Sequence, residues 1–302
     1  MTQIGFRRIV CASDFSLASL PAWMFAQRLA RATGAELTLL HVVAPVPVPL
    51  EVAFDVEGYQ QLADEEREAA RARGQQQLDG AIPGLRTRLR IEDGPAAVRI
   101  LKVVDEGATD AVVLGTHGRA GLDRLLLGSV AEQVIRLAHR PVVTARLVPT
   151  PPPPEEPIRR IVYPTDFSPP ARRAWAWVRA LAEATGAHVD LLHVLLEVVP
   201  DRHVDPAFLA RAAATIRRDA LRVTDAFVES CGLPGDRISV HLLHGVEAEQ
   251  IVHAARSHRA DLIVMGTHGR SGFLQLALGS VARRVLHGAP CPVMTVGPEV
   301  LA

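Results

Sequence analysis

The chain has 302 residues, of which 48% are hydrophobic and 22% are charged. Its 33 Lys and Arg residues balance 33 Asp and Glu residues, and no basic stripe interleaved with aromatic residues offsets the zero net charge. Nucleic-acid-binding surfaces require clustered positive charge. We therefore expect no nucleic-acid partner.

The sequence predicts neither export nor membrane insertion. Its first residues lead into a short apolar strand instead of a signal-peptide core, and no apolar stretch is long enough to span a bilayer. Cys11, Cys231 and Cys291 are odd in number and widely spaced, which predicts buried or idle thiols instead of a disulfide framework or a zinc site. We expect a cytoplasmic protein without a membrane partner.

The first half alternates short apolar runs with segments of helical periodicity. Proline and glycine mark several boundaries, such as Gly34 after the first helix and Gly94-Pro95 before the third. Strands that alternate with helices predict a parallel sheet covered on both faces. The predicted strands are 8–12, 36–43, 86–91, 111–114 and 141–145, and the predicted helices are 17–32, 59–78, 96–106 and 129–138.

A proline-rich segment separates two similar halves. Residues 149–157 form neither a helix nor a central strand and are predicted to be a stiff, extended linker. The second half repeats the order of the first. Its strands are predicted near 160–163, 188–194, 237–243, 261–265 and 292–296.

These patterns predict an α/β protein of two duplicated, doubly wound domains. Each domain would hold a five-stranded parallel sheet with helices on both faces. The expected domains are residues 1–147 and 158–302, joined by a linker at 148–157. Each half is large enough to bury its own core.

A spaced glycine motif occurs once in each half. Gly115-x-x-Gly118, nine residues and Gly128-Ser129 recur as Gly266-x-x-Gly269, nine residues and Gly279-Ser280. The offset between the copies is 151 residues for these glycines and 152 residues between Asp14 and Asp166. A repeat of this length indicates a duplicated domain, because solenoid units recur every 20–50 residues or so.

Three features of each half converge at the carboxyl ends of the strands, where doubly wound sheets bind ligands. An Asp after the first strand can accept hydrogen bonds from ribose hydroxyls, and a Val at the end of the second can read a flat heterocycle through its backbone. Glycines allow close approach to phosphate, beside a helix N-terminus and an Arg side chain. The candidate residues for an adenine nucleotide are Asp14, Val42, Gly115, Gly118, Arg119, Gly128 and Ser129, with Asp166, Val194, Gly266, Gly269, Arg270, Gly279 and Ser280 in the second half.

On these residues, both halves resemble the universal stress protein family nearly end to end. The family pattern is G-x-x-G-(nine)-G-[ST] with an Asp after the first strand and a Val after the second. The segment from Tyr163 to Ser168 is especially close to it, whereas the segment from Cys11 to Asp14 departs by lacking the proline. The resemblance implies a Rossmann-like fold that binds ATP, with or without Mg²⁺, and a regulatory role in stress adaptation.

The resemblance also implies that the last strands pair, which would make the two halves an intramolecular pseudo-dimer. A further homodimer and an unknown protein partner stay open. Two alternative functions also stay open. One is a slow ATPase or phosphotransferase, although the chain lacks a P-loop lysine. The other is a dimeric scaffold without nucleotide, in which the proline-rich residues 45–49 fill the first pocket.

Several candidate residues have a simpler structural explanation. The glycines can be turn residues, and Ser129 and Ser280 can be helix caps. The shared His117 and His268 have no acidic partner or nucleophile nearby in sequence and are interpreted as structural or phosphate-proximal. His41 and His193 are interpreted as core histidines with satisfied hydrogen bonds.

The two halves differ at one position of the phosphate-side helix. Residues 129–132 match the capping-box pattern, with Glu132 as its acidic member, whereas the second copy has Arg283 at that position. A cation near the phosphate end predicts that the C-terminal half binds nucleotide more tightly than the N-terminal half.

Overall fold

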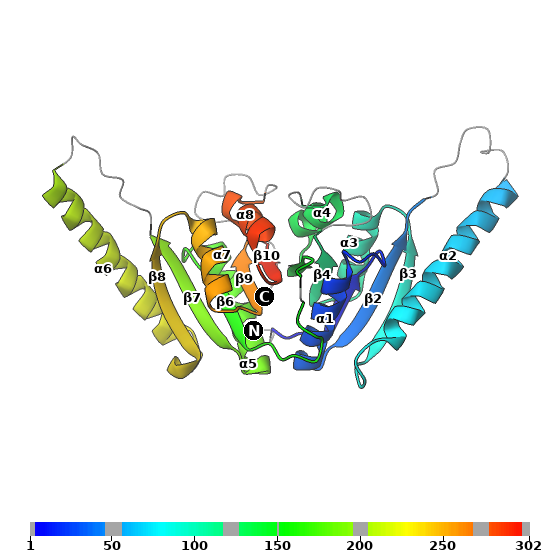
Figure 1. Cartoon of the computed structure of the whole chain (residues 1–302), viewed down its shortest axis with the longest axis horizontal. Helices are drawn as coiled ribbons and strands as arrows, with labels where there is room; N and C mark the ends of the chain where they lie inside the picture. Colours follow the sequence, from blue (N-terminus) through cyan, green and yellow to red (C-terminus); the bar gives the residue numbers. More distant parts are fainter. Residues whose placement is uncertain are drawn as a thin grey trace. The chain divides into compact units, whose positions relative to one another are not determined.

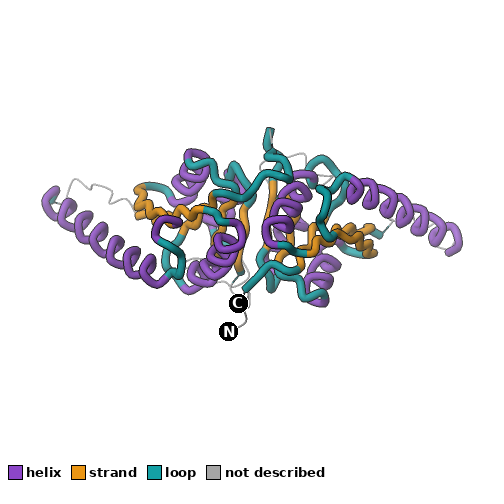
Figure 2. The backbone as a smooth tube through the Cα atoms, turned by 90° about the horizontal axis from the view of Figure 1, so that it is seen from below, coloured by secondary structure: helices purple, strands orange, loops and turns teal. Residues whose placement is uncertain are grey.

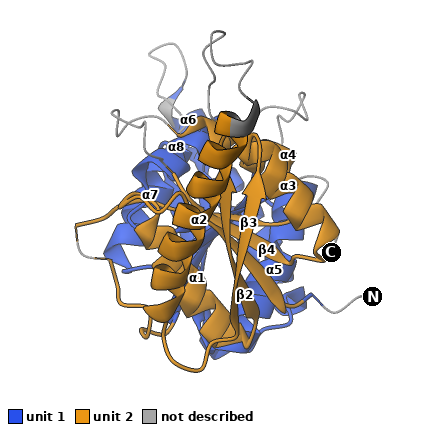
Figure 3. Cartoon of the chain, turned by 90° about the vertical axis from the view of Figure 1, so that its right-hand side faces the viewer, with its two compact units in different colours: residues 1–4, 158–298, 302 blue, residues 5–157, 299–301 orange. Residues whose placement is uncertain are grey.

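A computed structural model describes residues 4–45, 56–116, 127–149, 151–195, 205–267 and 278–297. The chain divides into two compact units, with the boundary between Pro157 and Ile158 (Figure 3). In the described ranges, no helix has both the length and the apolar character needed to cross a membrane.

The N-terminal half is a five-stranded sheet in the order β3-β2-β1-β4-β5, and each neighbouring pair is parallel. Figure 1 labels its strands β2, β3 and β4. Strand order reverses between β1 and β4. The elements are β1 Arg8–Ala12, α1 Leu20–Thr33, β2 Glu36–Val43, α2 Val56–Asp79, β3 Thr87–Asp93, α3 Ala96–Glu106, β4 Ala111–Gly115, α4 Ser129–Leu137 and β5 Val142–Ala145.

The C-terminal half repeats this topology in the order β8-β7-β6-β9-β10, again with parallel neighbours. Its strands β6 and β7 correspond to β1 and β2. The elements are β6 Arg160–Pro164, α5 Pro169–Thr185, β7 His188–Leu195, α6 Pro206–Ser230, the 3₁₀ turn η1 Gly235–Arg237, β8 Ile238–His244, α7 Glu247–Ser257, β9 Leu262–Gly266, α8 Ser280–Gly288 and β10 Val293–Val296.

Helices lie on both sides of the strands in each half (Figure 2). The chain moves from β1 to β2 to β3 in one direction across the sheet and then from β3 to β4 to β5 in the other. Because each crossover is right-handed, α1 and α2 cover one face of the sheet and α3 and α4 cover the opposite face. The C-terminal half follows the same rule. Since both faces are covered, strand residues such as Leu37, Leu39, Ile161 and Leu191 are completely buried.

The sequence prediction of fold class and strand positions is confirmed, with boundary shifts of one or two residues. The first helix begins at Leu20 instead of residue 17, because the chain makes a turn before it. The three cysteines are buried and are not disulfide partners, as expected.

The prediction of a stiff, extended linker is wrong in detail. The Glu156 N–H donates to the Pro153 carbonyl at 3.0 Å, which makes a turn. Arg28 of α1, only 3% exposed, donates from Nε to the Glu156 carbonyl at 2.8 Å and from Nη2 to the Pro157 carbonyl at 3.1 Å. The linker is therefore held against the N-terminal half, since proline-rich carbonyls that lack partner amides accept well from a buried guanidinium.

Replacing Arg28 by Met is expected to lower the free energy of unfolding of the N-terminal half by about 1.5–3 kcal/mol, because two charged hydrogen bonds are lost. Urea unfolding with pulsed hydrogen exchange and mass spectrometry resolves the two halves. The matched control is Arg31→Met, since Arg31 donates to the Glu155 carbonyl from an exposed position; its effect should stay within about 0.5 kcal/mol. Equal effects of the two substitutions would contradict the role given to the buried guanidinium.

Candidate functional site

The predicted site residues that the structure describes lie at the carboxyl edge of the sheet in each half. Ala12 pairs in register with Leu40 of β2 and with Leu114 of β4. Asp14 and Gly115, which follow these positions, therefore lie at the same level across the sheet as the end of β2. This edge adjoins the reversal of strand order between β1 and β4, which is where doubly wound folds bind ligands.

A tight turn follows the first strand of the N-terminal half. Asp14 Oδ1 accepts hydrogen bonds from the Ser16 N–H at 3.0 Å and the Ser16 hydroxyl at 2.6 Å. The Ser13 hydroxyl oxygen accepts from the Phe15 N–H at 3.1 Å. Phe15 has φ = 61°, an uncommon left-handed conformation for a bulky residue. The side chains of Ser13 and Asp14 therefore hold a backbone conformation that the local sequence alone disfavours.

The C-terminal half repeats this turn residue by residue. Asp166 Oδ1 accepts from the Ser168 N–H at 3.0 Å, and the Thr165 hydroxyl oxygen accepts from the Phe167 N–H at 3.0 Å. Phe167 has φ = 60°. A carboxylate offers about four lone-pair sites, so the use of Oδ1 for the turn is compatible with acceptance of a ligand hydroxyl.

The histidines of β2 and β7 support these turns, and both are hydrogen-bonded as expected, although His41 is buried whereas His193 is only half-buried. His41 Nδ1 lies 2.7 Å from the Ser13 carbonyl oxygen, and His193 Nδ1 lies 2.8 Å from that of Thr165. A carbonyl only accepts, so Nδ1 carries the proton in both rings. The ring of Phe15 stacks on that of His41 with centroids 4.3 Å apart.

Sequence reasoning did not assign a role to Phe15 or Phe167. The available signal was their recurrence, because the Asp-Phe-Ser triplet and the histidine of the next strand repeat with the same offset of 152 residues. The structure shows that each Phe lies against that histidine, with ring centroids of Phe167 and His193 5.0 Å apart.

The backbone N–H and C=O of Val42 point to the side of β2 on which β1 has already ended. The Leu40 carbonyl accepts from the Ser13 N–H at 2.9 Å, toward β1, and the Val43 carbonyl accepts from the Gly94 N–H at 3.0 Å, toward β3. Backbone groups of successive strand residues point to alternate sides, so the N–H and C=O of Val42 point toward β1. That strand ends at Ala12, and the Val42 peptide is therefore directed toward the candidate site.

Val194 is placed in the same way. The Leu192 carbonyl accepts from the Thr165 N–H at 2.9 Å, so the peptide of Val194, two residues further, points to the side of β6 beyond the end of that strand. The backbone predicted to read a heterocycle is thus directed toward the carboxyl edge in both halves.

In each half, a hydrogen bond joins the residue that follows the fourth strand to the glycine that precedes the next helix. The Thr116 carbonyl accepts from the Gly128 N–H at 2.7 Å, and the Thr267 carbonyl accepts from the Gly279 N–H at 2.9 Å. The N-termini of α4 and α8 are consequently held beside Gly115 and Gly266, at the carboxyl ends of β4 and β9.

The alternative interpretation of Ser129 and Ser280 as helix caps does not hold. The N-cap residues are Gly128 and Gly279, which have no side chain that could form a cap hydrogen bond. The serines are the first helical residues and are exposed. The capping box of residues 129–132 therefore does not form, since its pattern begins one residue too late. A helix N-terminus without a side-chain cap presents its N–H groups to an external acceptor.

Several predicted residues lie outside the described ranges. They are Gly118, Arg119, Gly269 and Arg270, together with His117 and His268. Their proposed contacts to phosphate stay predictions.

Fold and site together define a class: a tandem, doubly wound α/β protein with a candidate ligand site at the strand-order reversal of each half. The particular family follows from a family model, described as the universal stress protein family, which matches residues 5–146 and again residues 157–297. The chain belongs to the universal stress protein family.

Some relatives match nearly the whole chain, and others match one half of it. A universal stress protein of Mycolicibacterium smegmatis is 28% identical over 306 residues, covering 96% of this chain and 97% of the relative. A Thermus aquaticus universal stress protein is 38% identical over 139 residues, which is 46% of this chain and 98% of the relative. The crystal structure of a universal stress protein from Archaeoglobus fulgidus has a TM-score of 0.69 at 19% identity, covering 98% of this chain and 99% of the other, which shows the shared fold.

The turn geometry predicts distinct effects for two substitutions of Asp166. Replacement by Ala removes the acceptor for the Ser168 N–H and is expected to lower the free energy of unfolding by about 1–2 kcal/mol. Replacement by Asn keeps a side-chain oxygen acceptor and should cost less than about 0.5 kcal/mol. Urea denaturation of the two variants measures the difference, and equal losses would contradict the structural role of Oδ1.

Proposed function

We propose that this protein binds an adenine nucleotide, ATP foremost, at the carboxyl edge of each half, and that nucleotide occupancy regulates its activity in stress adaptation. The observation that carries the proposal is the Val peptide directed past the end of the first strand in both halves. An outward-facing N–H and C=O offer a donor and an acceptor to the edge of a flat base.

The neighbouring groups suit the rest of a nucleotide. The carboxylates of Asp14 and Asp166 are half-buried beside the same edge and accept hydroxyl hydrogen bonds of the kind ribose donates. The N-termini of α4 and α8, whose N-cap residues are glycines, favour an anion through their N–H groups and helix dipoles. ATP, with or without Mg²⁺, would supply the charge that these groups recognise.

The proposal includes two points that rest on the sequence and the family. The two halves would pair through their last strands within one chain, and the protein would act in the cytoplasm. Both points need their own tests, by crosslinking and by localisation of a tagged chain.

The primary test is to denature the purified protein and to identify and count the released nucleotide by chromatography and mass spectrometry. We expect bound ATP, or binding of added ATP with Mg²⁺, at up to two molecules per chain. Finding no released nucleotide and no binding at millimolar ATP with Mg²⁺ would contradict the proposal and favour the scaffold alternative. Release of ADP would instead favour the slow ATPase.

The role of the carboxylates is tested by the double variant Asp14→Asn with Asp166→Asn, which keeps each turn but removes the charge. We expect ATP affinity to fall about tenfold, because charged hydrogen bonds to ribose contribute about 1.4 kcal/mol or more. Calorimetric titration measures this change. Asp79→Asn is the control, since Asp79 ends α2 and accepts a hydrogen bond from Gln75 of the same helix; an equal loss in this control would reject the assigned role.

The difference between Glu132 and Arg283 supports a further part of the proposal, which is tighter binding by the C-terminal half. Both side chains are exposed in the first turns of equivalent helices, where a cation attracts and a carboxylate repels a phosphate group. Glu132→Arg should tighten the N-terminal site and Arg283→Glu should weaken the C-terminal site, with both shifts shrinking at high salt.

Titrations in backgrounds carrying Gly118→Val or Gly269→Val measure the two sites one at a time. The matched control is Arg136→Glu, which places a carboxylate in the last turn of α4 and should leave ATP affinity unchanged. Equal affinities of the two halves, or a tighter N-terminal site, would contradict this part of the proposal.

A further inference from the structure

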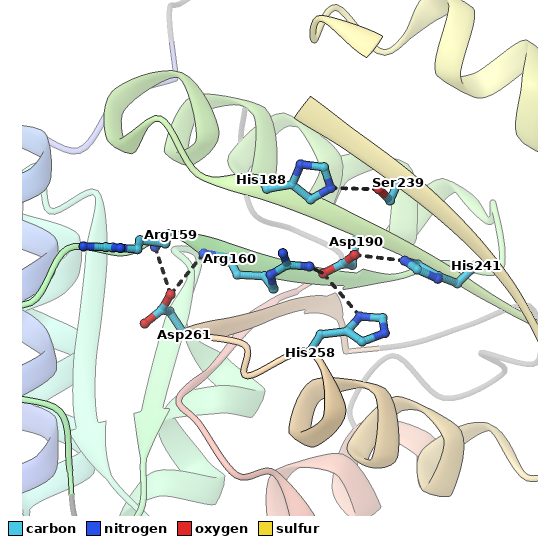
Figure 4. A network of polar contacts seen from close by, with 8 residues as sticks. All are labelled: Arg159, Arg160, His188, Asp190, Ser239, His241, His258 and Asp261. Atoms are coloured by element: carbon cyan, nitrogen blue, oxygen red, sulfur yellow. Dashed lines mark hydrogen bonds and ion pairs between the residues drawn. The ribbon is translucent and has the colours of Figure 1, made fainter. Parts of the chain in front are cut away.

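A second cluster of chemically competent side chains lies in the C-terminal half, away from the nucleotide edge. It consists of Asp190 of β7, His241 of β8 and His258, the residue that ends α7 (Figure 4). Along β7, residues 190 and 194 are about 13 Å apart at the usual rise per residue. The cluster is therefore distinct from the proposed nucleotide site.

The three side chains converge on one point. His241 Nε2 lies 2.9 Å from Asp190 Oδ1, and His258 Nδ1 lies 3.3 Å from Asp190 Oδ2. One ligand atom from each residue lies within 4.8 Å of the others. Ligand atoms around a tetrahedral zinc ion, with bonds of about 2.0–2.1 Å, are about 3.3 Å apart, so small side-chain movements give zinc-binding geometry.

The carboxylate of Asp190 is held in its charged form. The side chain is 1% exposed, and burial by itself raises its pKa, but hydrogen bonds from His241 and Arg160 outweigh burial and lower the pKa of this carboxyl. One carboxylate oxygen of Asp190 faces each histidine, and carboxylate oxygen is an established zinc ligand.

His258 contributes a ring nitrogen that makes no hydrogen bond in the described ranges. Its Nδ1 is inaccessible to solvent and, in the described ranges, makes no hydrogen bond despite its position beside Asp190. The residue lies at the C-terminus of α7, where the helix dipole favours a cation. The side chains of His241 and His258 are 30% and 26% exposed, so both imidazole rings are partly accessible to solvent.

The N-terminal half lacks this cluster at the equivalent positions. Thr38 replaces Asp190, Arg90 replaces His241 in the same register against the neighbouring strand, and Gly107 replaces His258 at the helix end. There the Thr38 hydroxyl oxygen accepts a hydrogen bond from Arg88 Nε at 2.8 Å. The shared fold therefore does not require the Asp-His-His combination.

We propose that Asp190, His241 and His258 form a binding site for a divalent transition-metal ion, Zn²⁺ foremost. Two imidazoles and one carboxylate suit zinc and neighbouring transition metals better than Mg²⁺ or Ca²⁺, which select oxygen ligands. Water completes the coordination. The site does not depend on the proposed nucleotide function.

Arg160 adjusts the affinity of this site. Its Nη1 lies 3.0 Å from Asp190 Oδ2 and competes with a metal ion for that oxygen. The Arg160 side chain is 40% exposed, so it withdraws toward solvent when the metal binds. Removal of this cation therefore strengthens metal binding, whereas in a purely structural cluster it would only remove a partner of Asp190.

The test uses the full chain, first dialysed against a chelator. Calorimetric titration with Zn²⁺ and competition with a chromophoric chelator are expected to show one zinc ion per chain, and Co²⁺ should give the visible absorption of a four-coordinate site. His258→Gln and Asp190→Asn should each weaken zinc binding at least about tenfold. Arg160→Gln should tighten it.

The matched control is His188→Gln. His188 lies near the cluster in Figure 4 but bonds through Nε2 to the Ser239 hydroxyl at 2.9 Å and is not one of the proposed ligands. Zinc affinity should change less than twofold in this variant. Circular dichroism confirms that each variant is folded, and His258→Gln keeps the test informative if the buried Asp190→Asn variant unfolds.

Three results would overturn the proposal. They are the absence of saturable Zn²⁺ binding in the unmodified chain, retention of full affinity in folded His258→Gln, and equal losses in His188→Gln and His258→Gln. A zinc-dependent rise in the melting temperature that disappears in His258→Gln but persists in His188→Gln would support it.

Discussion

The last hydrogen bond between the first two strands of each half determines the geometry of the nucleotide edge. After Ser13 donates to Leu40, the chain turns away from the sheet while β2 continues for three more residues. The equivalent bond from Thr165 to Leu192 does the same in the C-terminal half. Beyond this bond, one side of β2 and of β7 has no neighbouring strand. The N–H and C=O groups of Val42 and Val194, two residues later, therefore need hydrogen-bond partners other than a strand. The turns, the supporting histidines and the direction of the Val peptides all depend on this point of divergence.

The duplication preserves this edge and lets other positions diverge. The linker is held by buried Arg28 on α1, whereas the equivalent position in α5 is Ala180. The helices that follow the glycine motif carry Glu132 in one half and Arg283 in the other. Thr38 in the first sheet corresponds to Asp190 in the second. In each pair the two side chains differ in charge, so equivalent backbone positions have different electrostatic environments in the two halves.

The two proposed sites occupy different parts of the C-terminal sheet for a physical reason. The nucleotide edge uses backbone groups that become available where a strand ends. The Asp190 cluster instead uses side chains that project from the middle of β7 and β8 toward the end of α7, where a buried charge needs compensation. Parallel sheets offer both environments, because their ends expose peptides and their faces bury side chains beneath helices.

The sequence by itself determined the duplication and the order of strands and helices, and it placed Asp14, Val42 and Gly115 near the ends of strands, since apolar periodicity, glycines and prolines act locally. Tertiary structure decided what each residue contacts. It placed Gly128 instead of Ser129 at the helix cap, because the Gly128 N–H bonds to Thr116 across intervening residues. It turned the linker toward Arg28, and it brought together Asp190, His241 and His258, which are up to 68 positions apart in the chain. Contacts of this kind depend on strand register and helix packing, which no local pattern encodes.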